Sequence, residues 1–188
     1  MRKYNFLLVM LVAILAISCS QSSSDTQVSN LGTKWHWDKG TIVIETPERP
    51  TGQTSVIGLK APKMEFVRVG FVGLGMRGPA AVERFTYIPG VEIVALCDYE
   101  KERAEECQKL LKKASMPEAT VYSGEKGYEE LCKRDDIDLV YIATDWLHHF
   151  PVAMCAMENG KHTAIEVPSA MSLKECWALI DMSEKTRK

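Results

Sequence analysis

The sequence lacks a hydrophobic run long enough to cross a bilayer, because the apolar stretch Phe6–Ile17 has only about 12 residues. It also lacks an excess of charge, since 23 Lys and Arg residues balance 25 Asp and Glu residues to a net charge of −2. This balance gives no reason to expect nucleic acid or an anionic surface as a partner. The composition, 46% hydrophobic and 26% charged, is typical of a globular protein.

The first residues have the features of an export signal rather than of a folded element. Arg2 and Lys3 form a basic start, an apolar run follows, and Leu15–Cys19 reads Leu-Ala-Ile-Ser-Cys. This end is similar to a bacterial lipoprotein signal, although Ala16 stands where leucine is usual. We therefore expect lipidation at Cys19 and an exported, membrane-anchored protein in the periplasm, or on the outer membrane or cell surface, of a Gram-negative bacterium. A plain signal peptide is the alternative.

Composition divides the chain into a lipoprotein signal peptide, a flexible tether, an amino-terminal arm and a folded domain, at residues 1–19, 20–38, 39–65 and 66–188. The serine-rich tether cannot bury enough apolar surface to fold. In the arm, Thr41–Glu45 is a candidate short strand. The nearby Trp35 and Trp37 suggest either a docking anchor for the arm or a platform for sugar stacking.

The six cysteines include no C-x-x-C pair. With Cys19 lipidated, an odd number remains: Cys97, Cys107, Cys132, Cys155 and Cys176. Cys97 ends an apolar run, and both Cys107 and Cys176 fall on apolar faces of expected helices. We expect small buried side chains rather than disulfides or metal ligands, and we predict no metal site.

The stretch Phe66–Pro79 organises the folded domain. Its apolar start predicts a buried parallel strand, and Gly73, Gly75 and Gly78 follow at G-x-G-x-x-G spacing. In a dinucleotide-binding turn the first glycine allows the tight turn, the second lets a pyrophosphate approach, and the third lets helix and strand pack closely. Pro79 suits the first turn of the helix, whose free N–H groups attract phosphates.

An aspartate follows the glycine motif at the sequence spacing that a dinucleotide-binding motif requires. The second apolar run, Val91–Cys97, ends at Asp98, about 20 residues after the third glycine. A carboxylate there accepts hydrogen bonds from the adenosine ribose and repels a 2′-phosphate, so the pattern favours NAD over NADP. The alternative is a structural glycine turn followed by an ordinary solvated aspartate.

The remaining pattern alternates strands and helices, which predicts an α/β fold with a doubly wound, Rossmann-type parallel sheet. A helix C-cap at Asn159-Gly160 and a capping box at Ser172 and Glu175 mark two helix ends. The expected later strands are 91–97, 120–122, 137–143 and 162–165, and the expected helices are 78–87, 101–114, 128–134, 151–158 and one after 172.

Ligands bind beyond the carboxyl ends of strands in such sheets, where three segments should meet: Gly73–Arg77, Thr144–His149 and Glu166–Pro168. Met76 and Arg77 lie on the phosphate turn, and Arg77 is either a phosphate ligand or a solvated cation.

The other two segments carry further candidates. Trp146 and His149 belong to the expected loop after the fourth strand, where His149 is a cofactor ligand, a helix cap or a structural residue. We expect His148 to be solvent-facing or packed. Glu166 is an ionisable residue at a buried strand end, which is costly unless it meets a ligand or a partner.

The runs VRVGFVGLGMRGPAAVERF, VEIVALCD, YIATDW and AIEVPSA resemble the Gfo/Idh/MocA oxidoreductase-like family. They are most similar to its glycoside hydrolase family 109 branch, the NAD-dependent α-N-acetylgalactosaminidases. The resemblance covers about Glu48–Lys188. Dehydrogenases of the wider family have Glu-Lys-Pro after the fifth strand, whereas this chain has Glu166-Val167-Pro168, as the glycosidase branch does. Valine transfers no proton, so ordinary alcohol dehydrogenation is disfavoured.

The resemblance implies NAD as cofactor, an α-N-acetylgalactosaminide-type sugar as substrate, and a second, substrate-binding domain that is missing here. It implies cleavage with retention through transient oxidation at sugar C3, an exception to the two-carboxylate scheme. We assign no catalytic residue. The alternative functions are a sugar oxidoreductase and an incomplete NAD-binding fragment. A homo-oligomer is one possible assembly. With the glycines, the implied cofactor contacts are Met76, Arg77, Asp98, Trp146, Leu147, His148, His149, Glu166 and Val167.

Overall fold

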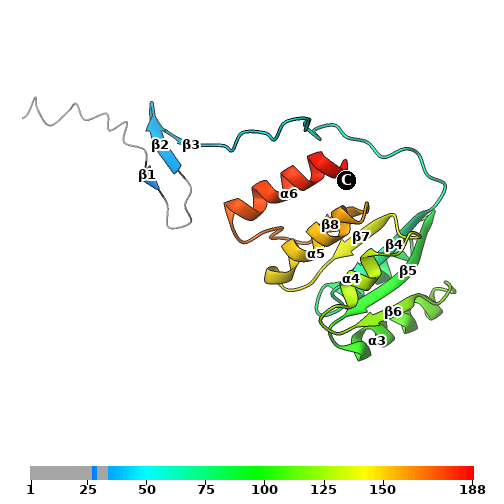
Figure 1. Ribbon diagram of the computed structural model, residues 1–188. Helices are drawn as coiled ribbons and strands as arrows, with labels where there is room; N and C mark the ends of the chain where they lie inside the picture. Colours follow the sequence, from blue (N-terminus) through cyan, green and yellow to red (C-terminus); the bar gives the residue numbers. More distant parts are fainter. Residues whose placement is uncertain (1–26, 29–33) are drawn as a thin grey trace, which may run out of the picture. The chain divides into compact units, whose positions relative to one another are not determined.

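The computed structural model of the chain describes residues 27–28 and 34–188 (Figure 1). The predicted signal peptide, the lipidation at Cys19 and most of the predicted tether lie outside the described residues. The chain divides into two compact units, Met1–Thr46 and Pro47–Lys188. Among the described residues, no helix is long and apolar enough to cross a membrane.

The first unit contains a small antiparallel sheet of strands β1 (Gln27–Val28), β2 (Lys34–Asp38) and β3 (Thr41–Ile44). The strand predicted at 41–45 is therefore confirmed. The boundary predicted between tether and arm, at residue 38, instead falls inside the β2–β3 hairpin. Cross-strand pairing stabilises residues that composition alone assigned to the tether, since Trp35 pairs with Ile44 and Trp37 with Ile42.

The second unit has the predicted architecture, a five-stranded parallel sheet in the order β6-β5-β4-β7-β8. Helices α2 and α3 pack on one face, and α4 and α5 on the other, with α6 against α5 (Figure 1). The strands are β4 (Val67–Val72), β5 (Val91–Asp98), β6 (Thr120–Ser123), β7 (Leu139–Ile142) and β8 (His162–Ile165). The helices are α2 (Gly78–Phe85), α3 (Lys101–Lys113), α4 (Gly127–Cys132), α5 (Trp146–Glu158) and α6 (Leu173–Thr186).

The central strand β4 supplies side chains to both faces. Val69 and Phe71 are buried with the α2 and α3 side chains, whereas Val72 is buried with those of α4 and α5. This alternation, with both faces covered, explains why the strand reads as a nearly continuous apolar run. At its start, the Arg68 guanidinium donates to both carboxylate oxygens of Asp138, at 2.9 and 2.7 Å, and holds the pKa of that carboxyl below its usual value.

Two details differ from the sequence-based expectation. Helix α5 begins at Trp146 rather than Pro151, because the Asp145 side chain accepts hydrogen bonds from the N–H groups of Leu147 and His148 and so caps a turn upstream of the proline. Cys176 is exposed, since the buried positions of α6 are Met182 and Glu184 instead. Cys97, Cys107 and Cys132 are buried as predicted.

The segment before β4 forms an ion pair and hydrogen bonds with residues of helix α6 and its C-cap. Arg49 donates from Nε and Nη2 to the two carboxylate oxygens of Glu184, at 2.8 and 3.0 Å, and this carboxylate is only 3% exposed. Near the end of the same helix, Arg187 donates to the Thr54 carbonyl oxygen at 2.9 Å. The predicted arm therefore includes a part that pairs with the folded domain.

Backbone segments approach one another closely at the glycine turn. A Cβ on Gly73, which has φ of +91°, would lie 2.4 Å from the Thr144 nitrogen, and a Cβ on Gly78 would lie 2.1 Å from the Gly73 oxygen. A Cβ on Gly75 would meet only Nη1 of Arg103, at 3.8 Å. Two of the three glycines are thus required by the fold itself, whereas the middle one leaves open space.

We expect Gly78→Ala to lower the free energy of unfolding by about 3 kcal/mol, because the added methyl must push apart two backbone segments. Gly75→Ala is the matched control and should change stability by less than about 1 kcal/mol, since its methyl enters open space. Urea unfolding followed by circular dichroism measures both. Equal destabilisation by the two variants would contradict this account of the turn.

Candidate functional site

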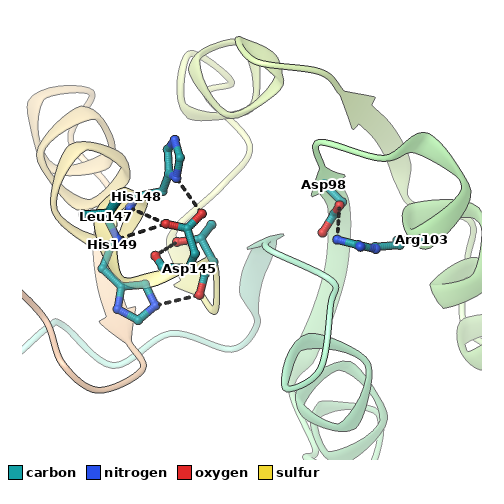
Figure 2. A network of polar contacts seen from close by, with 7 residues as sticks. Asp98, Arg103, Asp145, Leu147, His148 and His149 are labelled. Carbon is teal, nitrogen blue, oxygen red and sulfur yellow. Dashed lines mark hydrogen bonds and ion pairs between the residues drawn. The ribbon is translucent and has the colours of Figure 1, made fainter.

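The three predicted segments do meet at the carboxyl edge of the sheet, after β4, β7 and β8. Chain order reverses direction there, because β4 is followed by β5 on one side while β7 lies on its other side. Such a switch point leaves a crevice for ligands. Figure 2 shows the polar groups near this edge: Asp98 with Arg103, and Asp145 with the start of α5.

Asp98 occupies the predicted position at the end of β5, and its side chain is only 5% exposed. Oδ2 accepts a hydrogen bond from the Leu74 N–H at 2.6 Å, and Oδ1 accepts one from the Glu100 N–H at 3.0 Å. The carboxylate therefore fixes the glycine turn against the end of the neighbouring strand. It also places a negative charge where a ribose would approach the edge of the sheet.

Arg103 is a residue that the sequence analysis missed. Its Nη1 lies 3.3 Å from Oδ1 of Asp98 (Figure 2). The same Nη1 is the heavy atom nearest to a Cβ built on Gly75. A guanidinium is thus held beside the middle glycine, with its side chain 55% exposed. The sequence feature that could have identified Arg103 is its position in the first turn of the helix that follows Asp98.

The start of α2 suits an anion. Arg77 is its N-cap and makes no side-chain capping hydrogen bond, Pro79 stands in the first turn, and that turn contains no acidic residue. The first N–H groups of a helix have no partner within the helix, so they remain free for phosphate oxygens. Met76 is 96% exposed beside them, and Arg77 is exposed as well.

Beyond β7, the predicted loop residues belong to the first turn of α5. Oδ1 of Asp145 accepts from the Leu147 N–H at 2.9 Å, and Oδ2 lies 2.6 Å from Nδ1 of His148 (Figure 2). Burial opposes the charge on Asp145, but these hydrogen bonds outweigh it, so its pKa is lowered. Trp146 and Leu147 expose their apolar side chains.

His149 is buried, with 1% of its surface exposed. Its Nδ1 lies 2.7 Å from the Pro168 oxygen, and its Nε2 lies 3.1 Å from the Thr144 oxygen. A carbonyl oxygen only accepts, and a neutral imidazole carries an N–H on one ring nitrogen, so the tautomer decides which of the two oxygens receives the hydrogen bond. His149 thus lies between the segments that follow β7 and β8, and Asp145, not His149, caps the helix. Direct contact of His149 with a cofactor stays a prediction.

After β8, the side chains of Glu166 and Val167 differ sharply. Oε1 of Glu166 accepts a hydrogen bond from the Tyr141 hydroxyl at 2.6 Å, whereas Val167 is 81% exposed. Tyr141 was not singled out from the sequence, because it reads as one more apolar residue of a buried strand. In the described part of the chain, no group of three or more His, Cys, Asp or Glu side chains could hold a metal ion.

These residues fit a dinucleotide. Space at Gly75, free N–H groups at the start of α2 and a carboxylate at Asp98 are arranged along the edge of the sheet, on the β5 side of the switch point. Exposed Trp146, Leu147 and Val167, with Glu166 beside them, lie on the β7 and β8 side.

Sequence comparison agrees with this geometry. A family described as an oxidoreductase family with an NAD-binding Rossmann fold matches residues 67–188. Glycosyl hydrolase family 109 protein 5 of Phocaeicola vulgatus is 70% identical, over 100% of this chain and 36% of the relative. The chain therefore spans about a third of the length of the curated relatives it matches.

Solved structures have the same fold. A myo-inositol dehydrogenase from Lactobacillus casei, in complex with NAD(H) and myo-inositol, is 28% identical with a TM-score of 0.55, over 63% of this chain and 33% of that one. A UDP-N-acetylglucosamine 3-dehydrogenase from Acidithiobacillus ferrooxidans is 27% identical with a TM-score of 0.52, over 66% and 36%. The chain thus belongs to the Gfo/Idh/MocA oxidoreductase family, and residues 67–188 are its NAD-binding Rossmann domain.

Proposed function

We propose that this chain is the NAD-binding part of a retaining, NAD-dependent glycosidase that acts on α-N-acetylgalactosaminides. The observation that carries the proposal is Val167, which stands between Glu166 and Pro168 at the end of β8 and is 81% exposed at the site. A valine can neither take nor give a proton. The glycosyl hydrolase family 109 names of relatives that are 70% and 67% identical agree with a reaction other than simple dehydrogenation.

The residues at the sheet edge would hold the cofactor in a defined orientation. The uncapped start of α2 and the open space at Gly75 would receive the pyrophosphate, and Asp98 would accept from the adenosine ribose. Bound NAD would supply a reversible oxidation at sugar C3, which acidifies the C2 hydrogen so that the aglycone is eliminated and water is added. One neighbour is named as a 3-dehydrogenase of an N-acetylhexosamine nucleotide, which agrees with oxidation at that carbon.

A sugar oxidoreductase is the second candidate. Its support is the family itself and the likeness to a myo-inositol dehydrogenase at 28% identity. The two candidates differ in the fate of the hydride, which returns to the same sugar in the glycosidase but leaves with NADH in the oxidoreductase. Catalytic residues are assigned for neither, and we propose that they lie in the part of the relatives that this chain does not span.

We also propose export and membrane anchoring through Cys19. The support is the basic start, the short apolar run and the Leu-Ala-Ile-Ser-Cys end in the sequence. A glycosidase that regenerates NAD in each turnover needs only the bound molecule, which suits a compartment without a nicotinamide pool.

The first prediction concerns cofactor choice. The chain should bind NAD at least tenfold tighter than NADP, a difference of about 1.4 kcal/mol, because the Asp98 carboxylate repels a 2′-phosphate. Asp98→Asn should narrow this ratio while it keeps an acceptor for the Leu74 N–H. Fluorescence titration measures both affinities, with Asp135→Asn at an exposed position as the control. Equal affinities of the unaltered chain for NAD and NADP would refute the role of Asp98.

The second prediction tests the reaction. Fused to the remaining part of a family 109 relative, the chain should cleave an aryl α-N-acetylgalactosaminide without added NAD and without accumulation of NADH. In deuterium oxide the product should gain deuterium at C2, which direct displacement by paired carboxylates leaves untouched. Mass spectrometry and NMR measure this exchange. Accumulation of NADH in stoichiometric amounts would favour the oxidoreductase. Cleavage without deuterium incorporation at C2 would show that the proposed elimination mechanism is wrong.

The third prediction concerns the anchor. Cys19→Ser should move the protein from the membrane fraction to the soluble fraction, or leave it unprocessed, because the lipid acceptor is lost. Labelling with a fatty-acid analogue and membrane fractionation measure the change, with Cys176→Ser as the control cysteine variant. If the Cys19 variant stays in the membrane fraction and still incorporates lipid, Cys19 is not the anchor.

A further inference from the structure

The Glu166 carboxylate is held by a residue from the neighbouring strand. Tyr141 of β7 pairs in register with Ala164 of β8, and Glu166 follows Ala164 by one step of the strand alternation, so both side chains lie on the same face of the sheet. The Tyr141 hydroxyl then reaches along this face and donates to Oε1 of Glu166 at 2.6 Å. This hydrogen bond sets the direction of the carboxylate at the strand end.

The donor itself is fixed in place. The Tyr141 ring packs against Phe71 at a centroid distance of 5.2 Å and against Phe85 at 5.3 Å, with interplanar angles of 35° and 73°. Such packing leaves the ring little freedom. Burial, and then the hydrogen bond to Glu166, raise the pKa of the Tyr141 phenol, so the group remains a protonated donor at neutral pH.

The backbone around Glu166 is fixed as well. Its N–H donates to the Ile142 oxygen at 2.9 Å, and two residues later the Pro168 oxygen lies 2.7 Å from Nδ1 of His149. Because Oε1 already accepts from Tyr141, Oε2 has the larger remaining capacity to accept from a ligand. Glu166 is only partly buried, so the residue keeps some exposed surface after the end of β8.

Strand order tells which part of the cofactor lies there. Asp98 ends β5, and Glu166 follows β8, so these carboxylates are on opposite sides of β4 in the order β5-β4-β7-β8. A dinucleotide crosses the sheet at the switch point, with its adenosine on the Asp98 side. The nicotinamide half therefore extends toward β7 and β8.

We propose that Tyr141 is a positioning residue for the nicotinamide half of NAD: it orients Glu166 so that the second carboxylate oxygen accepts a hydrogen bond from a ribose hydroxyl or amide N–H of that half. The inference rests on NAD binding by this domain and not on the glycosidase reaction. Failure of the reaction test above would therefore leave it standing.

The experiment compares two ligands on the full chain. Tyr141→Phe keeps the ring packing but removes the donor. It should weaken NAD binding about fivefold, because a carboxylate that is no longer held loses its well-oriented hydrogen bond to the nicotinamide half. Binding of ADP, which lacks the nicotinamide half, should not change. Calorimetric titration measures both affinities, and a thermal unfolding midpoint checks the fold. Tyr87→Phe, at a 76% exposed ring just after the end of α2, is the control.

A double-mutant cycle then tests the path of the effect. Glu166→Gln should also lower the affinity for NAD more than the affinity for ADP. The double variant should bind NAD no less tightly than the single variant with the lower NAD affinity, because the two residues act through one carboxylate. The proposal is overturned by equal losses of NAD and ADP affinity, by unchanged NAD affinity in Tyr141→Phe, or by full additivity of the two substitutions. An unchanged ratio of NAD to ADP affinity in Glu166→Gln overturns it independently of how Tyr141→Phe folds.

Discussion

The close approach of the glycine turn to its neighbours is the constraint on which the site depends. A side chain on Gly73 would collide with the backbone after β7, and one on Gly78 would collide with Gly73 itself. Because these backbones touch, the start of α2 lies directly beyond the end of β4. The N–H groups of that helix therefore point to the edge of the sheet where a phosphate can reach them.

Two aspartates at the site accept hydrogen bonds from backbone N–H groups. Asp98 accepts from the Leu74 N–H and so ties the glycine turn to β5, while Asp145 accepts from N–H groups at the start of α5. For the buried Asp98 carboxylate, these hydrogen bonds replace lost hydration. Asp98 lies at the end of β5, with Arg103 beside it. The carboxylate that we propose to discriminate NAD from NADP thus also fixes the geometry of the glycine turn.

On the β7 and β8 side of the crevice, Tyr141 and His149 contact the segment that follows β8. The Tyr141 hydroxyl donates to the carboxylate of Glu166, and the His149 ring lies between the Pro168 oxygen and the Thr144 oxygen. Val167, next to Glu166 in the chain, is exposed. The arrangement presents one oriented carboxylate and one apolar side chain, which suits a site that must bind a cofactor firmly without using residue 167 for proton transfer.

Local pattern in the sequence was sufficient for the parallel sheet, the glycine turn and the position of Asp98, because strand alternation, helix period and turn chemistry are properties of neighbouring residues. It was insufficient for the start of α5, where Asp145 caps a turn that Pro151 seemed to exclude, and for the exposed Cys176. The roles of Arg103, Tyr141 and His149 were decided only by the tertiary structure. Their partners come from other strands and loops, and strand order and register bring those together.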